Sequence, residues 1–133
     1  MKATTNDRSQ LPVVVVHATS TPHSDLLARL GAADIRVLET ELIDQCVGEV
    51  PAGPAAVILF PDDFRFDQVV GILFALRRER TDVALTLVTA KPDVFTGLIV
   101  AGDWRIPPAI IQVSAPSSTI LETIRTLLRP FSG

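Results

Sequence analysis

The chain has one cysteine, no tyrosine and one tryptophan among its 133 residues. With Cys46 alone, it can form no internal disulfide and no zinc site built from several cysteines. No apolar run approaches the roughly 20 residues that a membrane helix needs, and residues 1–10 are polar, without the apolar core of a secretory signal. We therefore expect a cytoplasmic protein with no membrane insertion.

A strong excess of charge is missing as well, since the formal net charge is −3. The densest basic group, Arg77, Arg78 and Arg80, is interrupted by Glu79 and followed by Asp82, as expected of a solvated helix end. The glycine patterns of dinucleotide sites and P-loops are also absent. The sequence predicts no nucleic-acid partner, no cofactor and no metal.

What the chain does have is a regular alternation of short β-branched runs with longer amphipathic ones, in a sequence that is 47% hydrophobic. This pattern is typical of a parallel sheet with helices on both faces. The expected strands are 13–18, 35–38, 56–60, 83–89 and 109–113. The expected helices are 24–31, 41–47, 67–80, 93–101 and 118–129. We predict an α/β fold, a (βα)5 flavodoxin-like three-layer sandwich, in one domain over 11–130 that follows a flexible segment, 1–10.

One stretch resembles a known family. The sequence from Leu76 to Ala90, LRRERTDVALTLVTA, is similar to the third helix and fourth strand of receiver domains from bacterial two-component response regulators. The likeness continues in the four valines of the first strand, in Ala101-Gly102-Asp103 before the last strand, and in the closing helix that ends in IRTLL. The resemblance covers nearly the whole chain and implies a receiver-like domain of bacterial signalling.

Most of the family's working positions hold other residues here. The acidic pair that binds magnesium at the end of the first strand falls on His17 and Ala18, neither of which is a hard oxygen ligand. The phosphate-accepting aspartate at the end of the third strand falls on Phe60, or on Pro61 if the register shifts by one. The resemblance is therefore to the degenerate, pseudo-receiver type.

The far side of the same pocket is only partly preserved. Its hydroxyl residue is present as Thr89, but its lysine falls on Ser114 or Ala115, and its aromatic switch position falls on Ile111. Losing the acids and the lysine together avoids burying an unpaired charge. We expect a non-phosphorylatable domain that is not an enzyme, because no nucleophile with a base can be assembled in the sequence.

An alternative keeps chemistry at the strand ends. Asp62 and Asp63 follow the third strand closely, so with His17 and Thr89 they could bind an anion, a metal or a phosphoryl group. The other interpretation, which we favour, is that both aspartates cap the next helix and that His17 bonds to the backbone.

Surplus apolar surface on helix 93–101 points to a partner. If Val94, Leu98 and Ala101 pack inward, Phe95 and Ile99 share an outer face. The expected interaction face lies on helix 93–101, strand 109–113 and helix 118–129, and comprises Phe95, Leu98, Ile99, Trp104, Arg105 and Ile111. We predict a homodimer or another protein partner; alternatively, the loop 104–108 folds back over the helix.

Overall fold

The structure is a computed structural model that describes residues 12–17, 24–32, 36–40, 48, 50, 55–79, 83–100, 102, 104 and 106–128. Its centre is a five-stranded sheet with the order β2-β1-β3-β4-β5, in which every pair of neighbours is parallel. The strands are β1 (Pro12–Val16), β2 (Arg36–Thr40), β3 (Ala55–Leu59), β4 (Val83–Thr89) and β5 (Ala109–Gln112). The helices are α2 (Ser24–Ala32), the 3-10 turn η2 (Pro61–Asp63), α4 (Phe66–Glu79), α5 (Pro92–Val100) and α6 (Ser117–Leu128).

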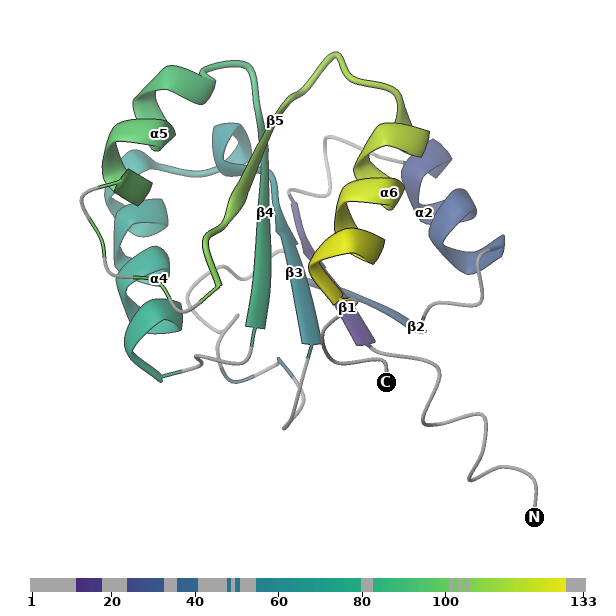
Figure 1. The fold of residues 1–133 in the computed structure, drawn as a ribbon, viewed down its shortest axis with the longest axis horizontal. Helices are drawn as coiled ribbons and strands as arrows, with labels where there is room; N and C mark the ends of the chain where they lie inside the picture. The colour runs from purple at the N-terminus through teal and green to yellow at the C-terminus, as the bar shows by residue number, and fades with distance from the viewer. Residues whose placement is uncertain are drawn as a thin grey trace.

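Helices cover both faces of the sheet, α4 and α5 on one side and α2 and α6 on the other (Figure 1). Alternate residues of each strand point to opposite faces of the sheet, so the valines of β1 pack into two hydrophobic clusters, one on each face. Val14 and Val16 pack with α4 and α5, whereas Val13 and Val15 pack with α2 and α6. The continuous apolar strands are explained by this double covering.

The central strands are buried along their whole length. Every residue of β3 and β4 is buried, including Thr86 and Thr89. The outermost strand, β5, is only partly buried and faces the viewer in Figure 1 between α5 and α6. Among the described residues, β5 pairs only with β4 and is therefore the edge strand on this side of the sheet.

The predicted flavodoxin-like α/β sandwich is confirmed, and the strand and helix limits agree with the expected ones to within two residues. The helix expected at 41–47 lies outside the described residues. The side chain of Phe74 is 49% exposed. It lies on the outer flank of α4, where the guanidinium of Arg77 stands 5.3 Å from the centre of its ring.

Within the described ranges, no helix has the length and apolarity needed to cross a membrane.

Candidate functional site

The carboxyl ends of the strands meet along one edge of the sheet, at the top of Figure 1. In open parallel sheets this edge is where ligands usually bind. His17 follows β1, Phe60 follows β3, and Thr89 is the last residue of β4. These are the positions where the resemblance predicts an emptied receiver pocket.

His17 is tied to the neighbouring strand β2. Its backbone N–H donates to the carbonyl of Thr40 over 3.1 Å, and its ring Nε2 lies 3.1 Å from Oε1 of Glu39. The ring is buried and meets the ring of Phe60 edge-on, with 6.4 Å between centroids. The backbone N–H of His17 continues the pairing of β1 with β2, and the printed partner of the ring is the Glu39 side chain. Ala18 lies outside the described residues.

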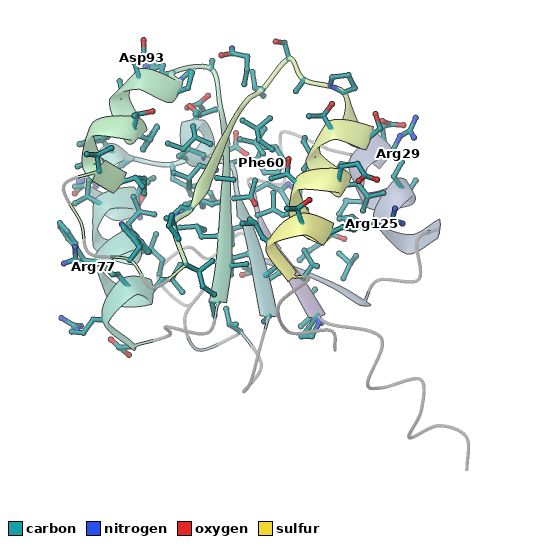
Figure 2. All side chains as sticks on the ribbon, in the orientation of Figure 1. Arg29, Phe60, Arg77, Asp93 and Arg125 are labelled. Carbon is teal, nitrogen blue, oxygen red and sulfur yellow. The ribbon has the colours of Figure 1, made fainter. Side chains whose placement is uncertain are left out.

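Phe60, the position to which the resemblance assigns an acceptor aspartate, is a core residue. It is 3% exposed and packs in the cluster between the sheet and α6, as Figure 2 shows. Its backbone N–H donates to the carbonyl of Val16 over 3.0 Å, which extends the pairing of β1 and β3 beyond the strands. Pro61, also buried, then starts η2, which turns the chain away from the sheet edge. A phosphoryl group has no acceptor atom at either residue.

Asp62 occupies the space beside β4. Its Oδ1 accepts a hydrogen bond of 2.7 Å from the hydroxyl of Thr89, and its Oδ2 accepts one of 2.7 Å from the backbone N–H of Ala90. The Thr89 hydroxyl in turn accepts from the N–H of Lys91 over 3.0 Å. Thr89 is 0% exposed, whereas the aspartate is exposed. The carboxylate therefore closes the end of β4 from the solvent side.

The expectation that Asp62 caps the next helix is wrong. The first turn of α4 is instead held by Gln68, whose Oε1 accepts from the N–H of Arg65 over 3.2 Å. The η2 turn keeps Asp62 two residues from the strand, close enough for its carboxylate to reach Thr89. Asp63 is half-buried, and its N–H donates to the carbonyl of Phe60 over 3.1 Å.

The four residues of the alternative site are only partly brought together. Asp62 meets Thr89, but the contacts shown for His17 are with Glu39 and Phe60, toward β2 and the core. Within the residues that the structure describes, no three metal-binding side chains gather. What the arrangement offers chemically is a carboxylate already engaged by two donors.

Ser114 lies in the exposed turn after β5. The N–H of Val113 donates to the carbonyl of Thr89 over 3.0 Å, so the end of β5 is fastened to the end of β4 by backbone alone. Ala115, the other candidate for the lysine position, is half-buried and packs against the core cluster on the α6 side. The two positions to which the resemblance could assign a lysine thus hold an exposed serine and a half-buried alanine.

The expected interaction face needs correction at two positions. Phe95 is 4% exposed and belongs to the core beneath α5, where its ring lies 6.1 Å from the ring of Phe66. Ile111 is 9% exposed and packs between β5 and α6. The helix is rotated from the orientation that we predicted, because the largest side chain of α5 fills the core while Val94 faces outward.

Leu98, Ile99 and Trp104 are half-buried and pack against the α4 side of the core, and Arg105 lies outside the described residues. The alternative in which the loop turns back over the helix is thus favoured at Trp104. The exposed large apolar residues around β5 are Val94, Val100 and Val113. Sequence periodicity did not single out Val100 and Val113, nor did it find Glu39 or the N–H of Ala90, which carry no motif.

No protein-family model matches this sequence, and no curated protein matches it significantly.

Proposed function

We propose that this chain is a receiver-like protein-interaction module that works without phosphorylation and associates with a second copy of itself through α5, β5 and α6. The single observation that carries the proposal is that the carboxyl ends of β3 and β4 are occupied by the protein's own side chains. Phe60 fills the end of β3 as a core residue, and the nearby carboxylate of Asp62 is held by Thr89 and Ala90. The setting that we propose is a bacterial signalling pathway in the cytoplasm.

Independence from phosphate is supported by the polar side chains at the described strand ends, which have partners within the protein. The buried hydroxyl of Thr89 has its acceptor, and His17 has the carboxylate of Glu39 beside it. A buried polar group left without a partner costs about 1–3 kcal/mol, so native structures satisfy most such groups. Here the protein satisfies them with its own side chains.

The outer edge of β5 supports an association surface. Val100 at the end of α5 is 78% exposed, and Val113 directly after β5 is also exposed. The polar side of the same face is α6, along which Ser118, Thr119 and Glu122 border a shallow hollow. An unpaired strand edge flanked by apolar side chains is suited to pairing with another chain.

The test of independence from phosphorylation is intact mass spectrometry after incubation with magnesium and acetyl phosphate. We expect an unchanged mass, since no free acceptor carboxylate stands at the end of β3. A phosphoryl adduct mapped to Asp62 or Asp63 would overturn the proposal.

The second candidate is a regulator that binds an anion, a metal or a phosphoryl group at the strand ends. The observation that favours this candidate is the 2.7 Å hydrogen bond between Asp62 and Thr89, which places a carboxylate beside the hydroxyl at the end of β4. Titration with magnesium, followed by the backbone amide signals of Ala90 and Lys91, separates the two candidates. Saturable shifts at these amides would support the regulator, and unchanged amides support the interaction module.

A further inference from the structure

The outer surface of α4 carries a straight row of exposed residues. The helix lies on the face of the sheet opposite α6 (Figure 1) and buries its sheet-facing side in the core. The row is spaced four, three and four residues apart, which in an α-helix places its members in one line. Its four members, all exposed, are Asp67, Gly71, Phe74 and Arg78. We call this line the α4 row.

Gly71 stands in the middle of the α4 row and of the helix. A side-chain carbon built on it would meet no atom within 4 Å, so the fold around it does not require a glycine. Glycine is also the least favourable residue after proline inside a helix, because it loses the most backbone freedom. A gap of this kind allows another surface to approach the α4 backbone closely.

Phe74 follows Gly71 by one turn and is the large apolar member of the row. Its side chain is 49% exposed, with the guanidinium of Arg77 5.3 Å from the centre of its ring. A large aromatic side chain buries much apolar area when a partner covers it. Next to each other on one surface, Gly71 offers a hollow and Phe74 offers a projection.

The two ends of the α4 row carry opposite charges. The side chains of Asp67 and Arg78 are 68% and 75% exposed. Each pairs within the chain only at the surface, with Arg65 at 2.9 Å and with Glu79 at 3.0 Å. Exposed pairs of this kind contribute little and can be exchanged. Asp67 and Arg78 lie about 16 Å apart along the helix axis, so they do not touch each other in one chain.

We infer that α4 packs antiparallel against α4 of a second copy of this chain, about a two-fold axis midway between Gly71 and Phe74. In this arrangement Phe74 of each copy covers Gly71 of the other. Asp67 of each copy likewise faces Arg78 of the other. The spacing of the row is that of the facing positions in coiled coils, and a two-fold interface uses the same surface on both copies.

The charges of the row select both the occupant and its direction. A parallel pair of helices would place Asp67 on Asp67 and Arg78 on Arg78, which is unfavourable. The antiparallel pair places unlike charges together at both ends and a ring over a glycine at both inner positions. A second copy thus carries the complement of this surface.

This contact goes beyond the proposed self-association, because it uses α4 and none of α5, β5 and α6. One face of a helix of 14 residues is smaller than a standard interface of about 1,600 Å². We therefore expect it to form at higher protein concentration than the proposed dimer and to join such dimers to one another.

The test is a charge exchange within the row, followed by sedimentation velocity at rising protein concentration. We expect the natural chain to form species larger than a dimer. Asp67→Arg and Arg78→Asp should each raise the concentration that this step needs about tenfold or more. The double variant, with both charges exchanged, should return it to within about threefold of the natural value. Arg29→Asp on α2 is the matched control and should change nothing.

The double variant also separates association from a merely structural role. An acid near the start of a helix and a base near its end are both favourable for the helix itself. If Asp67 and Arg78 acted only within their own helix, exchanging both would be the most harmful of the three changes. Recovery in the double variant therefore requires contact between chains.

Gly71→Gln gives an independent test of close approach. The substitution replaces a poor helix residue with a good one in open space, so the thermal unfolding midpoint should rise by a few degrees. The same side chain fills the place of the second copy's Phe74, so association through α4 should weaken about tenfold or more. Ala28→Gln, on exposed surface of α2, is the control for association.

Val100→Asp separates this inference from the proposed dimer. In that variant the association that remains should still respond to the charge exchange in α4. Association that responds to Val100→Asp and to no change in α4 would overturn the inference and leave the proposed dimer standing. The opposite pattern would support α4 pairing and contradict the proposed dimer.

Two further results would overturn the inference. They are a double variant that associates no better than either single variant, and a Gly71→Gln variant that associates as strongly as the natural chain. If an exchanged variant fails to fold, the natural chain decides by NMR. The backbone amide signals of Gly71 and Phe74 should then shift with protein concentration while that of Ala28 stays in place, and unmoved signals would contradict the contact.

Discussion

The hydroxyl of Thr89 donates a hydrogen bond of 2.7 Å to the carboxylate of Asp62, a residue 27 positions earlier in the chain. The bond joins η2 to the end of β4, and the second oxygen of the same carboxylate accepts from the N–H of Ala90. The loops after β3 and β4 are therefore fastened to each other at the sheet edge. The carboxylate of Asp62 makes this connection.

Replacing Asp62 with Ala should destabilise the protein by about 1 kcal/mol, because the buried hydroxyl of Thr89 loses its acceptor. Urea unfolding followed by circular dichroism measures the change. The matched control is Asp67→Ala, which removes an exposed ion pair with Arg65 and a carboxylate in the first turn of α4, and should cost less. Equal effects of the two substitutions would show that the bond to Thr89 contributes nothing to stability.

Placing an aspartate at the end of β3 should destabilise the protein. Phe60→Asp would place a carboxylate among apolar side chains and remove a buried ring, at a cost of about 3 kcal/mol or more. Phe66→Asp is the control, since Phe66 is 53% exposed and should tolerate the change far better. Thermal unfolding compares the two. A Phe60→Asp variant that is as stable as Phe66→Asp would contradict the core role of Phe60.

Replacing two threonines of β4 with valine, one at a time, should change the stability of the protein in opposite directions. Thr86 is buried on the α2 and α6 side of the sheet, and its hydroxyl has no hydrogen-bond partner among the described residues. Thr86→Val should therefore stabilise the protein by about 1 kcal/mol, whereas Thr89→Val should destabilise it because the partners Asp62 and Lys91 are lost. Denaturation midpoints give both values, and two changes of the same sign would refute this assignment.

Asp25, at the start of α2, should make stability depend on acid pH. Hydrogen bonding by Ser117 of α6, helped by the charge of Arg29, lowers the pKa of Asp25 below its ordinary value of 3.8. A lowered pKa in the folded state adds stability above the unfolded pKa, and this is lost as the pH falls through the folded one. Asp25→Asn should therefore be less stable than the natural chain near neutral pH, and the gap should close below pH 3.8. A gap that persists in acid would rule out titration of Asp25 as its cause.

The fold was readable from the sequence because its signals are repeated along the chain. Unbroken runs such as Val13 to Val16 indicate strands covered on both faces, and the same rule applies at β3 and β4. Helix orientation was less readable. Apolar residues surround almost the whole of α5, so periodicity could not decide that Phe95 faces the core and Val94 the solvent.

The site was predictable only in part. Comparing strand ends by position placed Phe60 and His17 correctly at the sheet edge, since parallel strands end together. The reach of Asp62 to Thr89 depends on the 3-10 turn after Pro61, which sequence spacing does not determine. The approach of Arg77 Nη1 and Trp104 Nε1 to the same point beside Gly102 is a tertiary contact, and a single sequence carries no signal for it.

Sedimentation velocity at several protein concentrations, with and without magnesium and acetyl phosphate, tests the central claim most directly. The account predicts a dimer of equal strength in both conditions, which Val100→Asp weakens about tenfold or more and which the control Ala28→Asp, on exposed surface of α2, leaves intact. A chain that stays monomeric at every concentration, or that dimerises only with acetyl phosphate present, would contradict it.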